Sequence, residues 1–133
     1  MTDQKRKLRS EIRNALANLS SDALQRKSDI ICRRIAETDE FTRALCVMLY
    51  LPMGEEIRLG VLAETAWRNG KTVCAPTSHK DRIIRAIEIK PADAGLFCPE
   101  MGLRSPLGRE IPVAGIDLVI VPATGISRPN GLL

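Results

Sequence analysis

The chain has few aromatic residues and only one histidine, and both shortages restrict what it can do. Trp, Tyr and Phe together make up 3% of its 133 residues, so a hydrophobic core has to be built from Leu, Ile, Val and Ala. The single histidine, His79, excludes a self-contained site that needs two imidazoles and argues against a Cys/His zinc site. Sparse aromatics also remove the stacking platform on which proteins bind single-stranded nucleic acid.

Long hydrophobic runs are missing as well. No apolar stretch approaches the roughly 20 residues that a membrane-spanning helix needs. The first residues, MTDQKRKLRSEIR, are charged throughout and lack the apolar segment of a secretory signal. We therefore expect a cytoplasmic protein with no membrane partner.

The cysteines are widely spaced and form no CxxC pair. They are Cys32, Cys46, Cys74 and Cys98. Three of them lie inside apolar runs, a pattern that is typical of buried free thiols in a reducing compartment. Disulfides or a metal site are the alternatives, and we assign no metal ligand.

The length and the charge are informative in a positive sense. A chain of 133 residues with 44% apolar residues forms one domain that buries roughly two thirds of its unfolded surface. The net charge is +4, and much of the excess lies near the N-terminus. A basic helix there can meet nucleic acid, a membrane surface or a phosphorylated small molecule, or can simply be a solvated face.

The spacing of apolar residues predicts helices that alternate with strands. A helical stripe over residues 4–19 is formed by Leu8, Ile12, Ala15, Leu16 and Leu19. On the same helix, Lys5 and Arg9 are one turn apart, so their side chains are neighbours. A second helix is expected to end near residue 36, and a third to end at Asn69-Gly70.

Three apolar runs of strand length each end in proline: ALCVMLYLP, KTVCAP and DLVIVP. Such runs are typical of strands that are covered on both faces. We therefore expect an α/β fold with parallel strands near residues 45–51, 72–75 and 117–121. RIIRAIEI predicts a further short strand, whereas residues 90–114 show no periodicity. Because ligands bind beyond the carboxyl ends of parallel strands, the candidate site segments are YLPMGEE, APTSHKD and VPATGIS.

The order of these segments resembles a known family. KxxLR near the N-terminus is followed by YLPMGEEI, a helix ending in Gly-Lys, a strand ending in Pro, a Gly-Leu-x-x-Pro segment and DLVIVP. From Lys5 to Pro122 this order resembles the 5-formyltetrahydrofolate cyclo-ligases, or methenyltetrahydrofolate synthetases. The resemblance implies a three-layer α/β sandwich with a mainly parallel sheet. It also implies an enzyme that uses ATP and Mg²⁺ to convert 5-formyltetrahydrofolate into 5,10-methenyltetrahydrofolate.

The resemblance implies roles for individual residues, although it identifies no catalytic residue. Lys5 and Arg9 match the family's basic pair that contacts ATP phosphates, with a solvated helix face as the alternative. Glu56 matches the folate-binding glutamate, with Glu55 as the competing register and a helix N-terminal acid as the alternative. The residues that would line the apolar wall of the folate pocket, or that otherwise serve ordinary packing, are Tyr50, Leu51 and Met53.

The last segment departs from the family pattern. Where relatives have Phe-Asp after the last strand, this chain has Ile126-Ser127, and the RLG and GYYD elements that follow in relatives are not found between Ser127 and Leu133. Ser105-Pro106 stands where many relatives have Glu-Pro. The expectation is a single cyclo-ligase-like domain, residues 1–133, that lacks its C-terminal portion. Early truncation, a frame disruption and a degenerate paralogue are the open explanations.

Three functions remain open at this point. The first is an ATP- and Mg²⁺-dependent cyclo-ligase-like enzyme whose activity is impaired, with a reduced folate and a nucleotide as partners. The second is a non-catalytic pseudoenzyme that binds folate or nucleotide. The third is a small basic nucleic-acid-binding protein, which ranks last because the sequence carries no recognisable nucleic-acid motif. Apolar surface left uncovered would favour self-association.

Overall fold

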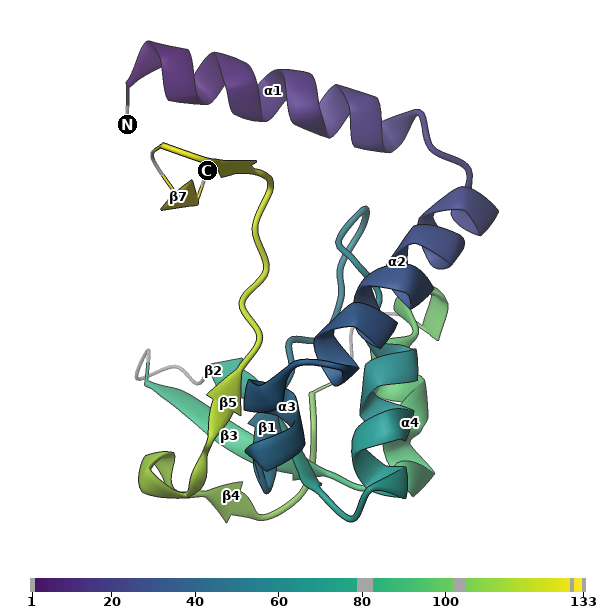
Figure 1. Cartoon of the computed structure of the whole chain (residues 1–133), viewed down its shortest axis with the longest axis vertical. Coiled ribbons are helices and arrows are strands. Elements are labelled where there is room, and N and C mark those ends of the chain that lie inside the picture. Colours follow the sequence, from purple (N-terminus) through teal and green to yellow (C-terminus); the bar gives the residue numbers. More distant parts are fainter. Residues whose placement is uncertain (1, 79–82, 102–104, 130, 133) are drawn as a thin grey trace.

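The computed structural model describes residues 2–78, 83–101, 105–129 and 131–132 (Figure 1). A five-stranded sheet has the order β4-β3-β2-β1-β5. Its strands are β1 (Cys46–Met48), β2 (Thr72–Ser78), β3 (Ile84–Ile89), β4 (Glu110–Ile111) and β5 (Leu118–Val119). Separately, β6 (Ile126–Ser127) pairs with β7 (Gly131–Leu132) in an antiparallel hairpin.

The three strands expected from the proline-terminated runs form the parallel part of the sheet. β1 pairs in parallel with β2 and with β5, and Val47 is in register with both Val73 and Leu118. β3 and β4 continue the sheet beyond β2 with antiparallel pairing. The predicted α/β class and the parallel arrangement of the three central strands are therefore confirmed.

Helices precede and connect these strands. They are α1 (Asp3–Ala17), α2 (Ser21–Ala36), α3 (Asp39–Arg43) and α4 (Gly60–Arg68). Hydroxyl side chains cap the first three, since Thr2, Ser20 and Thr38 accept hydrogen bonds from backbone N–H groups in the first turn of each helix. The segment without periodicity contains the short 3₁₀ helices η1 (Pro91–Phe97), η2 (Pro99–Met101) and η3 (Val113–Gly115). Among the described residues, no helix combines the length and apolar character needed to cross a bilayer.

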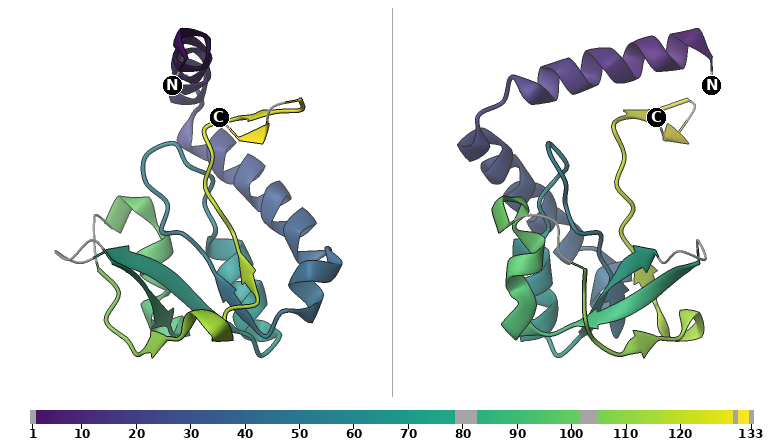
Figure 2. Two further views of the ribbon diagram at one scale, coloured as in Figure 1. Left: turned by 90° about the vertical axis from the view of Figure 1, so that its left-hand side faces the viewer. Right: turned by 180° about the vertical axis from the view of Figure 1, so that it is seen from behind.

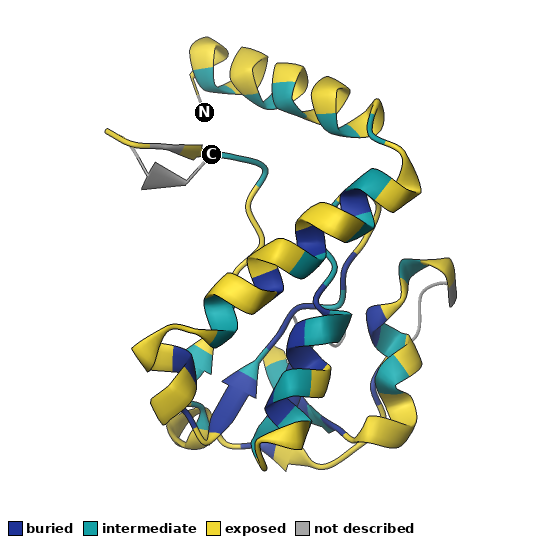
Figure 3. Cartoon of the chain, turned by 45° about the vertical axis from the view of Figure 1, so that its right-hand side comes forward, coloured by how far each residue is buried: buried dark blue, intermediate teal, exposed yellow. Residues whose placement is uncertain are grey.

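The main core lies between the sheet and helices α2, α3 and α4 (Figure 3). Val47 and Leu49 from β1 and its continuation, with Val73 from β2, are fully buried against Phe41 of α3 and Leu62 of α4. Alternate strand residues point to the other face, where a smaller cluster is formed by Cys46, Cys74, Ala86 and Ile111. β1 and β2 are thus covered on both faces, as their sequences indicated, whereas Val119 of β5 is 44% exposed, so the expected cover on both faces is wrong for β5.

All four cysteines are free thiols. Cys32, Cys46 and Cys74 are buried, as the sequence predicted, whereas Cys98 is exposed. Burial raises the pKa of Cys74 to about 12, so this thiol is protonated at neutral pH. Cys98 lies in the 3₁₀ region, where no apolar run predicted its surroundings.

Helix α1 projects away from the sheet (Figure 2). None of its residues is buried, and Leu8 in its apolar stripe is 38% exposed. The hairpin of β6 and β7 is the segment drawn beneath α1 in Figures 1 and 2. The apolar periodicity predicted the helix correctly, but its stripe packs outside the main core.

Side chains fix the beginning of β1 from two directions. Asp117, just before β5, accepts hydrogen bonds from the backbone N–H groups of Leu45 and Cys46 at 2.9 and 3.0 Å. Lys71, just before β2, donates to the carbonyl of Ala44 at 2.6 Å and lies over the ring of Phe41. These contacts tie both parallel neighbours to the start of β1, which helps to set their register.

Replacing Glu88 with Gln should destabilise the fold in a pH-dependent way. Glu88 on β3 pairs with Arg109 at 2.8 Å and with Lys90 at 3.1 Å, and the hydrogen bond from Arg109 lowers the pKa of Glu88. A lowered folded-state pKa stabilises the fold above the unfolded-state value of about 4.3. That contribution is lost as pH falls through the folded-state pKa.

Urea unfolding of the wild type and the Glu88→Gln variant measures this effect. At neutral pH the free energy of unfolding of the variant should be about 1 kcal/mol lower than that of the wild type. The difference is small because both cationic partners are exposed. The difference should shrink as pH falls below about 4. A difference that stays constant down to that pH would show that the ion pairs do not carry the effect.

Candidate functional site

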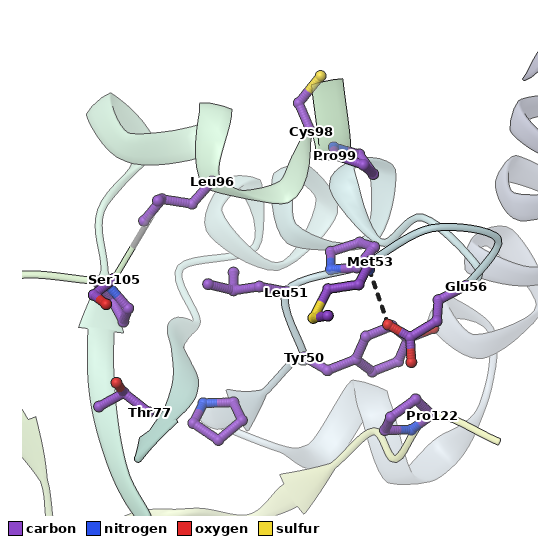
Figure 4. Close-up of a pocket in the computed structure, with 13 residues that line it drawn as sticks. Tyr50, Leu51, Met53, Glu56, Thr77, Leu96, Cys98, Pro99, Ser105 and Pro122 are labelled. Atoms are coloured by element: carbon purple, nitrogen blue, oxygen red, sulfur yellow. Dashed lines mark hydrogen bonds between the residues drawn. The ribbon is translucent and has the colours of Figure 1, made fainter. Parts of the chain in front are cut away.

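A cavity of about 410 Å³ opens at the carboxyl edge of the parallel strands (Figure 4). The chain after β1 supplies Tyr50, Leu51, Pro52, Met53 and Glu56; the end of β2 supplies Pro76 and Thr77; and the chain after β5 supplies Pro122. Parallel pairing therefore brings together the three segments that the sequence singled out. The part of the second segment at residues 79–81 lies outside the described residues.

The four positions expected on the folate side all line this cavity (Figure 4): Tyr50, Leu51, Met53 and Glu56. Tyr50 is buried and Leu51 is half-buried, whereas Met53 is exposed at the rim. Glu56 lines this cavity and a second one beside it, and Glu55 lines only the second. The geometry thus distinguishes the two acidic residues between which the sequence could not choose.

A tight turn sets the position of the Glu56 carboxylate. Its Oε1 accepts a hydrogen bond from the backbone N–H of Met53 at 2.9 Å, and the backbone N–H of Glu56 donates to the Met53 carbonyl at 3.0 Å. Gly54 in this turn has φ +56°, which favours glycine. Helix α4 begins only at Gly60, and its first turn contains no acid, so the alternative of a helix N-terminal acid is wrong. Among the described residues, Oε2 of Glu56 has no hydrogen-bond partner, and it is available to a ligand.

Tyr50 braces the same loop from the cavity wall. Its hydroxyl donates to the carbonyl of Ile57 at 2.8 Å. Burial raises the pKa of the Tyr50 phenol, and the nearby Glu56 carboxylate raises it further. The phenol therefore stays neutral and keeps its proton for the hydrogen bond to Ile57.

A second cavity, of about 300 Å³, adjoins the first. It shares Met53 and Glu56 with the first cavity and is also lined by Arg13 and Leu16 of α1 and by Ala123 and Thr124 after β5. The C-terminal chain thus passes both cavities in turn, with Pro122 at the first. α1 closes one side of the second cavity.

The basic pair expected to contact phosphates lies on α1. Lys5 and Arg9 are half-buried, and Nε of Arg9 is buried without a hydrogen-bond partner among the described residues. Arg13 follows one turn later on the same face. Of these three residues, Arg13 is the one that lines a cavity together with Glu56. That Lys5 and Arg9 face the same cleft as Glu56 stays a prediction.

The wall opposite Glu56 escaped the sequence reasoning. Its described residues are Leu96, Cys98, Pro99, Ser105 and Pro106. All come from the Pro- and Gly-rich segment that showed no periodicity. A local signal was Gly108, where a Cβ atom would collide with the Glu88 carbonyl, so only glycine lets this segment approach β3. Gly102 and Leu103 of the Gly-Leu-x-x-Pro segment lie outside the described residues.

The acidic side chains that the structure describes do not form a protein metal centre. Within the described ranges, no three His, Cys, Asp or Glu side chains are grouped closely enough to hold a metal ion.

Comparison with known proteins gives a consistent result. Residues 1–132 match the 5-formyltetrahydrofolate cyclo-ligase family. The structure is similar to a 5,10-methenyltetrahydrofolate synthetase from Aquifex aeolicus, with a TM-score of 0.69 at 20% identity over 92% of this chain. It is also similar to a synthetase from Mycoplasma pneumoniae, with a TM-score of 0.67 at 18% identity over 97% of this chain. The chain spans 62% of the first protein and 69% of the second.

The Tyr50 phenol should resist ionisation at alkaline pH. Tyr50 is the single tyrosine of the chain, so the ultraviolet difference absorbance of tyrosinate reports this residue alone. A free phenol is half-ionised near pH 10, but the raised pKa should keep Tyr50 neutral there while the fold persists. The raised pKa of Tyr50 stabilises the fold fully below about pH 10, the unfolded-state value, and this stabilisation is lost as pH rises from there through the folded-state pKa.

Two comparisons sharpen this measurement. Urea-unfolded protein should titrate near pH 10, and the Tyr50→Phe variant should give no tyrosinate signal. If folded wild-type protein titrates at the same pH as unfolded protein, then the phenol is not held as the structure describes.

Proposed function

The chain belongs to the 5-formyltetrahydrofolate cyclo-ligase family, and on that premise we propose that it binds a reduced folate in the 410 Å³ cavity. The observation that carries this proposal is the convergence of the four folate-side positions on one cavity. The volume is in the range of small-molecule sites. The proposed reaction is the ATP- and Mg²⁺-dependent conversion of 5-formyltetrahydrofolate into 5,10-methenyltetrahydrofolate.

The cavity offers a reduced folate both polar and apolar contacts. The free Oε2 of Glu56 would accept hydrogen bonds from the N–H groups of the pterin ring. Leu51, Met53 and the ring of Tyr50 would pack against the flat faces of the ligand. Because Oε1 of Glu56 is already held by Met53, the carboxylate is oriented before the ligand arrives, which lowers the entropic cost of binding.

The N-terminal helix would supply the contacts to the nucleotide. Lys5 and Arg9 are one turn apart, and two neighbouring cations can clamp a phosphate. The unpartnered Nε of Arg9 is a donor that such an anion would satisfy. Arg13, one turn after Arg9, lines the cavity that shares Glu56 with the folate cavity.

Among the described residues, no group of three or more potential ligands offers Mg²⁺ a site made by the protein alone. The ion commonly binds through substrate phosphates with few protein ligands, so we propose that it enters on the triphosphate. We assign no residue of this chain to it.

The proposed chemistry consists of activation followed by ring closure. Transfer of a phosphoryl group from ATP to the formamide oxygen makes that oxygen a good leaving group. Attack by the neighbouring folate nitrogen then closes the ring and releases phosphate. The protein contributes by positioning the two substrates and by compensating phosphate charge.

The segment after β5 limits how well residues 1–133 can hold a triphosphate. Ala123-Thr124-Gly125 contains one glycine and no acid, whereas phosphate loops use several backbone N–H groups and glycines. A non-catalytic folate- or nucleotide-binding role is therefore the second candidate.

We also propose a cytoplasmic location, and self-association through exposed side chains near β5 such as Val119 and Val121.

Folate binding should depend on Glu56 and not on Glu55. Glu56→Gln keeps the shape of the side chain and removes the charge that accepts pterin N–H groups. We expect the dissociation constant for 5-formyltetrahydrofolate, measured by titration calorimetry, to rise approximately tenfold, since a charged hydrogen bond contributes roughly 1.5–3 kcal/mol. Glu55→Gln is the matched control and should bind within about twofold of wild type. A larger loss in the control would exchange the roles of the two residues.

Residues 1–133 should turn over slowly or not at all with 5-formyltetrahydrofolate, ATP and Mg²⁺, as followed by the absorbance of methenyltetrahydrofolate. Losing a preorganised phosphate contact costs on the order of several kcal/mol of transition-state stabilisation. ATP binding should still weaken about tenfold in Arg9→Gln. Arg6→Gln, which removes an exposed pair with Asp3, should have little effect. Turnover comparable to that of an active cyclo-ligase of this family would contradict the expectation of low activity.

A further inference from the structure

A chain of side-chain contacts links helix α2 to the far wall of the folate cavity. Gln25 donates from Nε2 to Asp29 at 2.9 Å, and its Oε1 accepts from Nη1 of Arg58 at 3.1 Å. Nη2 of Arg58 pairs with Oε1 of Glu100 at 3.0 Å. Glu100 in turn accepts through Oε2 from Sγ of Cys98 at 2.9 Å. None of these contacts involves the folate-side residues already described.

Arg58 differs from the surface ion pairs of this protein because its charge is largely removed from water. The side chain is 13% exposed, against 81% and 82% for the Arg43–Asp39 pair. Its Nε is buried without a partner among the described residues, and Nη2 also reaches Ser21 at 3.2 Å. A buried guanidinium needs an anionic partner, and Glu100 is the carboxylate that meets it.

The backbone of Arg58 is also fixed. Its N–H donates to the hydroxyl of fully buried Ser28 at 2.9 Å, and its carbonyl accepts from Sγ of Cys32 at 3.3 Å. The preceding carbonyl, that of Ile57, accepts the Tyr50 hydroxyl. Arg58 is therefore a rigid continuation of the loop that holds Glu56 and forms the near wall of the cavity.

The far wall has less support of its own. Cys98 and Pro99 line the folate cavity on one side and a smaller cavity of about 150 Å³ on the other. The nearest anchor is buried Phe97, whose ring meets Trp67 edge-on at 6.2 Å. The wall residues beyond Phe97 therefore have space on both sides, and Glu100 connects them to Arg58.

We infer that Arg58 is a positioning residue whose ion pair with Glu100 sets the spacing between the near and far walls of the folate cavity. Glu56 and Tyr50 belong to the near wall, and Cys98 and Pro99 belong to the far wall. The width of the cavity, and thus the fit of a flat ligand, then depends on a contact outside it. The inference rests on the proposed function for the identity of the ligand, but the spacing itself does not.

Cys98 provides a measurement that needs no ligand. It is the exposed cysteine, whereas Cys32, Cys46 and Cys74 are buried. The hydrogen bond to Glu100 raises the pKa of the Cys98 thiol and so slows its alkylation by iodoacetamide. The Arg58 charge itself lowers the pKa of the Cys98 thiol, so loss of that charge alone would slow alkylation, whereas release of the Glu100 carboxylate should speed it.

The test is a double-mutant cycle with Arg58→Gln, Glu100→Gln and the double variant. We expect each single variant to speed Cys98 alkylation several-fold and to speed amide hydrogen exchange over Leu96–Glu100. We expect each single variant to weaken 5-formyltetrahydrofolate binding about tenfold. The double variant should bind it no more weakly than the single variants do. Arg43→Gln, the matched exposed arginine, should change none of these values.

The readouts separate the possible failures. Unchanged alkylation and exchange in Arg58→Gln would overturn the positioning role. Additive effects in the double variant would overturn it too. So would a loss of folate binding that is confined to Arg58→Gln and tracks reduced stability in urea. Glu100 is 55% exposed, so its substitution should not disturb the core. If wild-type protein binds no reduced folate, the proposed function fails, while the alkylation and exchange cycle still decides whether Arg58 sets the wall.

Discussion

The site depends on one constraint, the parallel pairing of β1 with both β2 and β5. Parallel strands end at the same edge, so three segments that are distant in sequence meet there without a dedicated scaffold. The contacts of Asp117 and Lys71 at the beginning of β1 support this register. A slip of one residue would turn every side chain of β1 to the opposite face of the sheet.

The two walls of the cavity are built by different physical means. The near wall is a turn that contains Gly54. In this turn the backbone N–H of Met53 donates a hydrogen bond to the Glu56 carboxylate, and the Ile57 carbonyl accepts one from the Tyr50 hydroxyl. Local hydrogen bonds suffice there because the partners lie close in sequence. The described part of the far wall combines the short 3₁₀ helices η1 and η2, which have poorer hydrogen-bond geometry, with irregular backbone at Ser105 and Pro106. It therefore needs a partner from elsewhere, and Glu100 finds it in Arg58.

This difference explains what the sequence could predict. Apolar runs ending in proline were enough for the three parallel strands, and their carboxyl ends predicted the segment around Tyr50 and Glu56. The described wall residues between 96 and 106 could not be placed, because short 3₁₀ helices and irregular backbone leave no apolar period. β4 covers only two residues, too few to show alternation alone. The partnership of Arg58 with Glu100 spans distant positions, and only the folded chain brings them together.

The packing of Trp67 has an optical consequence. Trp67 is the single tryptophan; its indole N–H donates to the Ile89 carbonyl at 3.1 Å and its ring meets Phe97 edge-on. The indole thus links β3 to the residue that immediately precedes Cys98. All tryptophan fluorescence of the protein originates at the base of the far wall, outside the ligand cavity. The emission wavelength therefore reports how the far wall packs against β3. A ligand in the cavity would shift it by changing that packing.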